Sequence, residues 1–409
     1  MKILMLSSIF PCPSVYGGTP LRTFHLMKYL SDRHKVTLVT QRSEEVTDAD
    51  VENLQKCVQE LVVFPTVEIP KTQNGLFDKA KRWQSYIQQG TPARVLSQYS
   101  PIMQSWVNEA VNSTAFDVVT SEDSINEIYV RAEWQNKIRT VVNVHSSLYG
   151  EWKLQLSNQF SENDLRDSLK LPWLRRYEER YCSKFSVVVA TTTEDRKQLK
   201  AINPETKISV IPNGVDLSLF PKRSSDPGGE QLIFVGVLNN PANVDAVRFF
   251  SLEVFPELSL RYPNLTLQLV GANPAAEVLE LTEIKGITVI GNVPSVIDYL
   301  HSATVCVVPL RMSGGMQNKT LEAMAAGVPV VASDRGLAGI DVDGANFPIR
   351  AMRANTIEEY IYAIGRLLIE PKLRDKLSSN ARSLIEKEYT WERAGALYEK
   401  ALSQSETSA

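Results

Sequence analysis

The stretch VVPLRMSGGMQNKTLEAMAAGVPVVASD, residues 307–334, decides the fold of this 409-residue chain. Two apolar, strand-like runs enclose a glycine-containing loop and a short alanine-rich helix. A strand, a helix and a second strand in this order are typical of a parallel sheet that is covered by helices. The helix carries Lys319 and Glu322, one turn apart. Because a packed core gains nothing from either charge, both side chains are candidates for ligand binding.

The same alternation of strand-like and helical segments continues along the whole chain. Many apolar runs are continuous rather than alternating, which is typical of strands buried on both faces of a parallel sheet. The two sets of strands exceed one sheet, so we predict an α/β fold class with two doubly wound, Rossmann-like domains facing a central cleft. The expected strands are 2–7, 35–40, 60–65, 116–121, 140–145, 186–191 and 208–212, followed by 231–237, 265–271, 287–291, 304–310 and 329–333.

A change of composition marks the boundary between these domains. The segment PKRSSDPGGEQ, residues 221–231, is rich in Pro, Gly, Ser and charge, and it precedes a new strand. We therefore expect an N-terminal domain over 1–218, a linker near 218–230 and a C-terminal domain over 230–388. A last helix is expected over about 389–405, and its apolar face is formed by Trp391, Ala394, Tyr398 and Leu402.

Composition and charge argue against several classes of protein. The chain is 43% hydrophobic and 22% charged, which is usual for a soluble globular protein. Its formal net charge of −3 gives no electrostatic indication of a nucleic-acid partner. No apolar run reaches the roughly 20 residues of a membrane span, and the 4 cysteines lack metal-ligand spacing. We therefore expect a cytoplasmic protein with reduced thiols.

A helical insertion separates the third and fourth expected strands, over residues 66–115. Its mixture of Lys, Arg, Trp and Tyr is compatible with peripheral contact to the inner face of a membrane or to a lipid-linked acceptor. An ordinary amphipathic surface helix explains the same composition and is the simpler interpretation. Both interpretations stay open at the level of sequence.

Two glycines mark the first loop as a candidate binding loop. Gly17 and Gly18 directly precede an expected helix, with Thr19 as its N-cap and Pro20 at its first position. A glycine pair lets the backbone approach a phosphate or a sugar closely, and a turn that needs a positive φ angle is the alternative. The loop is not a G-x-G-x-x-G fingerprint, which argues against a dinucleotide-dependent oxidoreductase.

Polar residues also follow two later strands of the first half. His145 ends the strand 140–145, where its imidazole can bond a sugar hydroxyl or a phosphate, or make a structural hydrogen bond. Glu122 and Asp123 follow the strand 116–121 and are candidates for orienting an acceptor hydroxyl. Capping of the next helix is the alternative role for these two acids.

In the opening stretch, we expect the helix to run from Asn318, as N-cap, to Gly327. Lys319 then lies in the first turn, where a cation opposes the helix dipole by up to about 1 kcal/mol unless an anion such as phosphate binds there. Glu322 does not fit a capping box with Asn318 and is available to ribose hydroxyls. Arg311, at the strand end, offers a second phosphate contact. A surface Lys319–Glu322 ion pair is the alternative.

Two Asp-x-Asp patterns are candidate metal sites, at 48–50 and 341–343. The first falls in a charged helix start and the second in a turn. Neither follows a strand, as a metal–nucleotide site requires. We therefore predict no required metal and no cofactor.

Four segments of the chain are distinctive, namely ISVIPNGVDLSLF at 208–220, FVGVL at 234–238, GNVPSVIDYLHSATVCVVPL at 291–310 and LEAMAAGVPVVAS at 321–333. They resemble segments of the GT-B glycosyltransferases of family 4. The PLR…NK…LEAMA arrangement at 309–325 resembles a branch of this family that is associated with bacterial exopolysaccharide assembly. The resemblance covers nearly the whole chain. It implies a retaining, metal-independent transfer from a nucleotide-activated sugar, with the donor in the C-terminal domain, the acceptor in the N-terminal domain, and the last helix crossing back to the N-terminal domain.

The resemblance also implies roles for individual residues. Glu322 matches the acid that holds the donor ribose, and His145 matches the histidine near the reacting sugar. Gly17 and Gly18 match the N-terminal glycine loop, and Val293 matches the backbone that pairs with the base. The other expected donor contacts are Gly236, Val237, Leu238, Asn239, Gly314, Gly315, Met316, Gln317, Asn318, Lys319 and Thr320.

The chain departs from the family pattern at three positions. Gly314 stands where the family usually has a glutamate that grips the donor sugar, and Val237 and Ala242 stand where it usually has an Arg and a Lys that clamp the pyrophosphate. We expect Arg311 and Lys319 to replace this clamp. Together with His145 they are the expected catalytic residues, acting by positioning and by stabilising diphosphate charge.

We therefore predict a hexosyltransferase that uses a UDP-sugar, with UDP-glucose favoured, and a glycan or lipid-linked acceptor in extracellular or envelope polysaccharide synthesis. Two alternatives stay open. A GT-B-like sugar-nucleotide epimerase would need several ionisable residues in the cleft, and the sequence offers few. A non-catalytic protein that binds nucleotide sugars is suggested by the missing glutamate and the missing basic pair.

Overall fold

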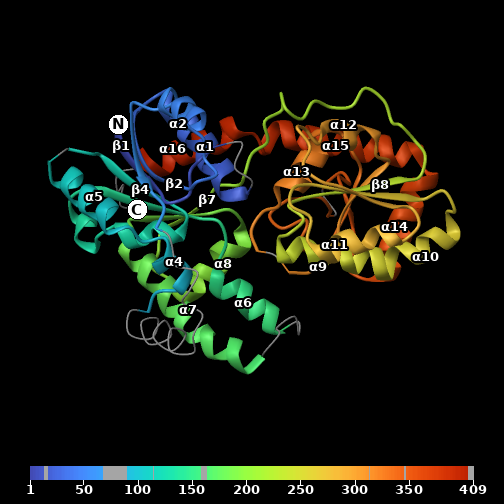
Figure 1. The fold of residues 1–409 in the computed structure, drawn as a ribbon, viewed down its shortest axis with the longest axis horizontal. Coiled ribbons are helices and arrows are strands. Elements are labelled where there is room, and N and C mark those ends of the chain that lie inside the picture. Colours follow the sequence, from blue (N-terminus) through green and yellow to red (C-terminus); the bar gives the residue numbers. More distant parts are fainter. Residues whose placement is uncertain are drawn as a thin grey trace. The chain divides into compact units, whose positions relative to one another are not determined.

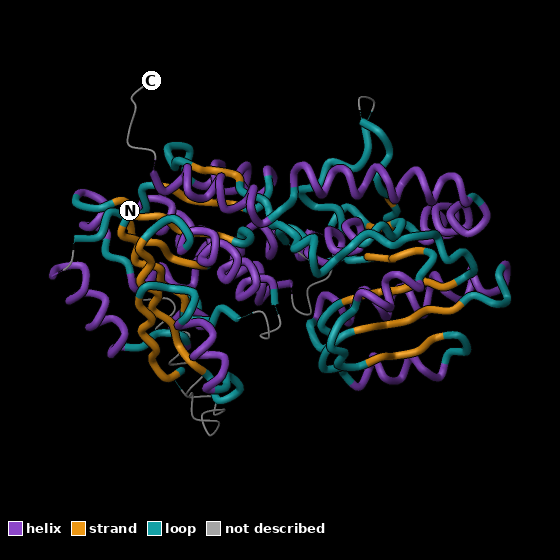
Figure 2. Tube along the Cα trace, turned by 90° about the horizontal axis from the view of Figure 1, so that it is seen from above, coloured by secondary structure: helices purple, strands orange, loops and turns teal. Residues whose placement is uncertain are grey.

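The computed structural model describes residues 1–12, 17–67, 90–113, 115–157, 164–312, 314–344 and 347–403. The chain forms two compact units, Met1–Ile211 with Ala394–Ala409, and Pro212–Arg393. Each unit contains one parallel sheet with helices on both faces (Figure 1). Coloured by secondary structure, the strands of each sheet run beside one another between helices (Figure 2).

The described residues of the first unit form a sheet of 7 parallel strands in the order β3-β2-β1-β4-β5-β6-β7. The order turns back between β1 and β4, where Ile3 pairs with Val118. β1 is a continuous apolar run because both faces of the sheet are covered. The strands are β1 (Lys2–Ser7), β2 (Lys35–Arg42), β3 (Glu60–Pro65), β4 (Val118–Glu122), β5 (Arg139–Val144), β6 (Val187–Ala190) and β7 (Ile208–Val210).

Helices cover this sheet, and the last helix of the chain returns to it. Met103 of α5 and Tyr177 of α7 share one apolar core with Leu4 and Leu6 of β1. On α16, Gly395 lies so close to the Tyr29 ring that a Cβ would meet its Cγ at 2.2 Å. The helices are α1 (Gly18–Ser31), α2 (Asp48–Gln55), α4 (Ala93–Ser97), α5 (Pro101–Ser113), η1 (Ser124–Tyr129), η2 (Ala132–Asn136), α6 (Leu148–Ser157), α7 (Asp164–Lys184), α8 (Thr193–Ile202) and α16 (Trp391–Ser403).

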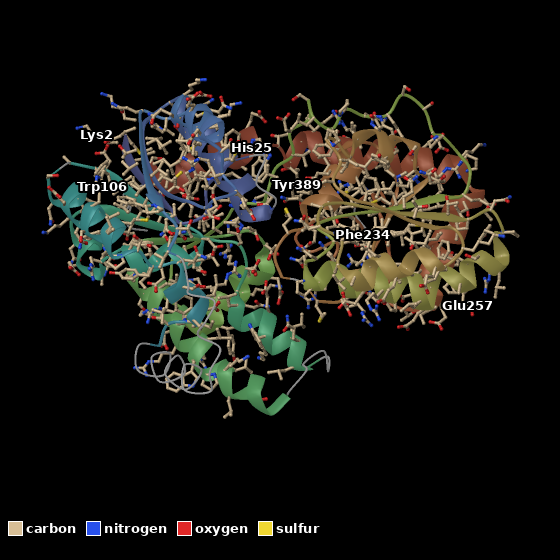
Figure 3. All side chains as sticks on the ribbon, in the orientation of Figure 1. Lys2, His25, Trp106, Phe234, Glu257 and Tyr389 are labelled. Atoms are coloured by element: carbon tan, nitrogen blue, oxygen red, sulfur yellow. The ribbon has the colours of Figure 1, made fainter. Side chains whose placement is uncertain are left out.

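The described residues of the second unit form a sheet of 6 parallel strands in the order β10-β9-β8-β11-β12-β13. The order turns back between β8 and β11, where Leu232 pairs with Val305. Figure 3 labels Phe234, a core residue of β8. The strands are β8 (Gln231–Val235), β9 (Thr266–Val270), β10 (Ile287–Ile290), β11 (Val305–Val308), β12 (Val330–Ala332) and β13 (Met352–Arg353).

Two groups of helices cover the faces of the second sheet. The helices α12, α13 and α15 lie on one face, and α9, α10, α11 and α14 lie on the other (Figure 1). Their bounds are α9 (Pro241–Phe249), η3 (Phe250–Val254), α10 (Phe255–Arg261), α11 (Ala276–Leu279), η4 (Glu280–Glu283), α12 (Ile297–Ser302), α13 (Asn318–Ala325), α14 (Ile357–Ile369) and α15 (Pro371–Glu388).

The predicted fold class is confirmed, since both sheets are parallel and doubly wound. All twelve predicted strands are present. The structure adds the short β13 (Met352–Arg353), which was not predicted because it does not lie in an apolar run. The predicted apolar face of the last helix is also confirmed. Its four residues are each at most 5% exposed, namely Trp391, Ala394, Tyr398 and Leu402.

The boundary between the units differs from the expected linker near 218–230. The second unit begins at Pro212. Backbone hydrogen bonds explain this, because the Val215 N–H donates to the Tyr389 carbonyl at 2.9 Å and the Arg223 N–H donates to the Ala326 carbonyl at 3.0 Å. The segment before the polar stretch therefore already packs on the second unit.

The membrane-contact hypothesis rests on the insertion at 66–115, of which residues 68–89 lie outside the described part of the chain. The described remainder includes α4 and α5. Within the ranges that the structure describes, no helix is both long enough and apolar enough to span a bilayer. Contact of the insertion with a membrane stays a prediction.

Candidate functional site

In the second unit, two loops that carry predicted binding residues meet at the point where the strand order turns back. Gly236, Val237, Leu238 and Asn239 follow β8, and the segment that follows β11 leads into α13. Open parallel sheets bind ligands at the carboxyl ends of strands at such a switch point. The fold thus brings together two segments that are far apart in the sequence.

Lys319 is the second residue of α13, and its ammonium group lies against the loop after β8. Its Nζ donates a hydrogen bond to Asn243 Oδ1 on α9 and lies 4.9 Å from the centroid of the Phe234 ring. A Cβ at Gly236 would come within 3.2 Å of this Nζ, so a glycine leaves room for the amine. Burial lowers the pKa of Lys319 to about 8, and the charge of Glu322 opposes this shift.

Glu322 lies one turn further along α13 and is half-buried. Burial raises the pKa of its carboxyl to about 7, and the charge of Lys319 opposes this shift. Because Lys319 is half-buried as well, the alternative of a solvated surface pair does not describe these residues. No hydrogen bond is recorded for the Glu322 carboxylate within the described residues, so its oxygens can accept bonds from a ligand.

Arg311, at the end of the β11 segment, has a different environment from the one expected. Its Nε donates to Asp245 Oδ2 at 2.9 Å and its Nη2 donates to Asp245 Oδ1, which makes a bidentate ion pair. The guanidinium carbon lies 4.7 Å from the centroid of the Phe249 ring. The charge of Arg311 is therefore already compensated by Asp245. The sequence analysis instead expected Arg311 to be open to a phosphate group.

The N-terminus of α13 also differs from the expected one. Gln317 is the N-cap and makes no side-chain capping bond, whereas Asn318 is the first helical residue. The Asn318 Oδ1 instead accepts a hydrogen bond from Asn213 Nδ2 at 2.8 Å. The Gln317 amide donates back to the Gly314 carbonyl at 3.3 Å. The first N–H groups of α13 thus have no side-chain cap, as in helices that bind anions.

The remaining predicted donor contacts divide into core residues and loop residues. Met316 is buried in the core, and the buried Thr320 donates to the Gly336 carbonyl at 2.7 Å. Both side chains thus fix α13 and its loop. Gly315 has a φ of +67°, which allows the chain to turn into the helix. Val293 follows β10, is half-buried and packs on the core with its side chain.

In the first unit, His145 directly follows β5 and is half-buried. Its Nε2 is inaccessible to solvent and has no hydrogen-bond partner among the described residues. Burial lowers the pKa of the imidazole to about 4, Asp123 opposes the shift, and Arg22 and Arg94 add to it. The ring is therefore neutral at pH 7, and its Nε2 is both unpaired among the described residues and closed to solvent.

Glu122 does not fit the predicted acceptor-side role, because it is completely buried. The Tyr398 hydroxyl donates to its Oε1 at 2.6 Å, and Asn143 Nδ2 donates to its Oε2 at 3.0 Å. Arg22, also fully buried, donates from Nε to Asn143 Oδ1 at 3.2 Å. Burial raises the pKa of Glu122 while these donors and Arg22 lower it. This acid joins α16 to the sheet.

Asp123 and the glycine loop remain near the surface of the first unit. Asp123 has a φ of +79°, and its Oδ1 accepts the Ile125 N–H at 3.4 Å, so it takes the alternative capping role. Its Oδ2 also accepts from the Thr19 hydroxyl at 3.3 Å. Gly17, not Thr19, is the N-cap of α1 and has a φ of +137°. Gly18 is exposed, with nothing within 4 Å of an added Cβ.

The two Asp-x-Asp patterns take structural roles. Asp48 and Asp50 form the first turn of α2, where Thr47 and Asp50 make a capping box. Asp343 forms an ion pair with Arg353. In the part of the chain that the structure describes, no three His, Cys, Asp or Glu residues are grouped to hold a metal ion.

The residues missed by the sequence analysis are Asn243 and Asp245, which bind Lys319 and Arg311. The sequence pattern that could have identified them is Asn-x-Asp in the first turns of α9, the helix that follows β8 and Gly236. Arg94, near His145, was also missed. Its signal is weak, since nothing in the sequence places it beside a histidine more than 50 residues later.

Comparisons with known proteins agree with this architecture. Residues 16–219 match the family described as Glycosyltransferase Family 4, and residues 229–370 match the one described as Glycosyl transferases group 1. Glycosyltransferase 1 domain-containing protein 1 of Xenopus tropicalis is 27% identical over 152 residues, which are 34% of this chain but only 41% of that protein. Lipopolysaccharide 1,2-N-acetylglucosaminetransferase of Salmonella typhimurium is 21% identical over 336 residues, 74% of this chain and 81% of that protein. Anabaena HepE, solved in complex with UDP-glucose, has a TM-score of 0.66 at 16% identity, covering 99% of this chain and 100% of that one.

Proposed function

The chain belongs to the family 4 glycosyltransferases of the GT-B fold, and from this premise we propose that it transfers a hexose from a UDP-sugar to a glycan or lipid-linked acceptor. The observation that carries the proposal is the half-buried pair Lys319 and Glu322, which opens α13 beside the loop after β8. UDP-glucose is the favoured donor, because a protein of similar fold has been solved with it. The Salmonella relative acts on lipopolysaccharide, which supports an envelope polysaccharide as the acceptor class.

Each donor group has a counterpart among the residues of the second unit. The Lys319 ammonium and the uncapped N–H groups of α13 bind the diphosphate. The Glu322 carboxylate accepts bonds from the two ribose hydroxyls. The backbone near Val293 pairs with the base, and Gly236 allows the phosphates to approach the end of β8 closely.

The proposed transfer is retaining and needs no metal. The bond between the anomeric carbon and the diphosphate oxygen breaks, the acceptor oxygen bonds to the same face, and the acceptor proton passes to the leaving UDP. Lys319 and the α13 N–H groups stabilise the negative charge that develops on the diphosphate. Arg311 contributes less than Lys319, since Asp245 already compensates its charge.

The first unit supplies the acceptor-side groups in this proposal. The neutral imidazole of His145 has an unpaired Nε2 for a sugar or acceptor hydroxyl, and because this atom is closed to solvent, the contact requires neighbouring side chains to move when the substrate binds. Gly17 and Gly18 offer an exposed backbone. Asp123, whose Oδ1 caps η1, is proposed to orient the acceptor through its other oxygen, Oδ2, whereas Glu122 is withdrawn from that role by its burial. A lipid-linked acceptor would bring the reaction to the inner face of a membrane.

A thermal-shift screen over UDP, GDP and their sugars tests the donor class. A nucleotide present at 100 times its Kd stabilises the folded protein by about 2.7 kcal/mol. We expect UDP-glucose to give the largest shift, and no shift with any nucleotide would contradict the proposal.

Transfer to an acceptor followed by NMR of the anomeric proton tests retention, and added EDTA tests independence from metals.

A non-catalytic nucleotide-sugar-binding role is the second candidate, favoured by Gly314 at the position of the usual sugar-gripping glutamate. Slow release of UDP from UDP-glucose that disappears in Lys319→Ala supports the enzyme over this candidate. Binding of UDP-glucose without any release, with every acceptor tried, supports the non-catalytic role. An epimerised nucleotide sugar formed without an acceptor would identify an epimerase instead.

A further inference from the structure

We propose that Asn243 is a positioning residue, which holds the Lys319 ammonium group at the end of β8 without neutralising it, while Asp245 keeps Arg311 as a structural cation. This inference rests on the proposed function, because it assumes that Lys319 binds a diphosphate. It adds a residue pair on α9 that decides which of the two cations is presented to the donor.

The geometry of Asn243 connects three elements. Its Oδ1 accepts from Lys319 Nζ on α13, and its Nδ2 donates to the Val237 carbonyl at 2.8 Å in the loop after β8. Asn243 is the third residue of α9, which begins at Pro241, and it is buried, with only 8% of its surface exposed. Both polar atoms of the amide are therefore used, which fixes the direction in which Lys319 is held.

The chemistry of the two α9 side chains separates the two cations. An amide oxygen accepts a hydrogen bond from an ammonium group but leaves its positive charge intact. The carboxylate of Asp245 instead forms a bidentate ion pair with Arg311 and cancels its charge. Lysine also has a long, flexible side chain, so a fixed acceptor is needed to aim its charge.

The close packing at the end of β8 supports this role. A Cβ on Gly236 would lie 2.9 Å from Asn243 Nδ2 and 3.2 Å from Lys319 Nζ. On the neighbouring strand end, a Cβ on Gly271 would lie 1.8 Å from the Gly236 carbonyl. A side chain on Gly236 would therefore displace the amide–ammonium contact, and one on Gly271 would displace the Gly236 backbone.

The test compares Kd values for UDP and for uridine, which lacks the phosphates, between pH 6.5 and 9.5. We expect Asn243→Ala to weaken UDP binding at least fivefold, to leave uridine binding within twofold, and to move the alkaline loss of UDP affinity to lower pH. The reason is that the ammonium loses its acceptor. Asn243→Asp should also weaken UDP binding, but move the alkaline loss to higher pH, because a carboxylate stabilises the ammonium. The other groups that face Lys319, Glu322 and the Cys306 thiol, are the same in all these variants.

Asn240→Ala is the matched control, since Asn240 caps the same helix through the Ala242 N–H at 3.0 Å without contacting Lys319. It should leave the ratio of UDP to uridine affinity unchanged. An Asn243→Ala variant with wild-type UDP affinity and pH profile, alongside a defective Lys319→Ala, would overturn this inference alone. If Lys319→Ala also binds UDP normally, the proposed function itself fails. Should Asn243→Ala not fold, Asn243→Asp decides, and an unchanged UDP affinity and pH profile would overturn the inference.

Discussion

Glu122, which ends β4 in the first unit, and Glu322, on α13 in the second, are both buried or half-buried acids with a cation nearby. Burial raises the pKa of both. Their hydrogen bonds differ, however, because Glu122 is completely buried and accepts from Tyr398 and Asn143, whereas none is recorded for the Glu322 carboxylate among the described residues. A buried or half-buried acid is thus a binding candidate only when its carboxylate oxygens are not already paired within the protein.

The largest expected effect comes from replacing Glu122, the acid whose carboxylate is fully hydrogen-bonded within the protein. Glu122→Ala removes the carboxylate charge that acts on the buried Arg22, and it removes the acceptor of the Tyr398 hydroxyl. We expect the free energy of unfolding to fall by about 3–5 kcal/mol. Urea denaturation measures it, with UDP affinity of the folded fraction unchanged. A loss below about 1 kcal/mol would mean that the network does not hold α16.

The next largest effect is expected in the second unit, at Lys319, the cation beside Glu322. Lys319→Ala removes the cation proposed for the diphosphate, and we expect kcat/KM to fall by about 10²–10³, as for the loss of one preorganised donor to a developing charge. Stability should change little, because Asn243 can bond water once the amine is gone. Steady-state kinetics with UDP-glucose measure the first quantity and urea denaturation the second. Arg311→Ala is the comparison variant, with a smaller kinetic effect, and a larger one than that of Lys319→Ala would reverse their roles.

Removing a single bond from the satisfied acid should have a smaller effect. Tyr398→Phe keeps the packing of α16 but deletes the donor at 2.6 Å from Glu122 Oε1. A hydrogen bond to a charged group is worth about 1.5–3 kcal/mol, so the free energy of unfolding should fall by that amount. Wild-type stability in this variant would show that water replaces the hydroxyl, and therefore that water reaches the Glu122 carboxylate.

The smallest effect is a dependence on pH. Burial raises the pKa of Glu322 to about 7, so between its unfolded value of 4.5 and pH 7 the folded protein binds more protons than the unfolded chain. The free energy of unfolding attributable to Glu322 therefore decreases as pH rises through this window. Comparing wild type with Glu322→Gln at pH 5 and pH 7.5, we expect the stability difference to change by about 1–2 kcal/mol in that direction. No change would mean that solvent screens the carboxylate.

Local sequence was sufficient for the fold and for proposing two residues of the candidate site. Continuous runs such as 305–308 define buried strands, and two charges in an alanine-rich helix identify Lys319 and Glu322. The partners of these and similar charges were not predictable, because they come from distant segments. Asp245 lies 66 residues before Arg311, and Tyr398 lies 276 residues after Glu122. Periodicity and capping rules act within a few turns and carry no information on such pairs.

Calorimetric titration of UDP into wild type, Glu322→Gln and Glu122→Gln tests the central claim most directly. If open bonding capacity defines the site, Glu322→Gln weakens UDP at least about tenfold, as the loss of a bond to a charged group implies. Glu122→Gln, although less stable, should bind UDP with wild-type affinity. The claim is contradicted if Glu322→Gln binds UDP as tightly as wild type, or if wild type does not bind UDP.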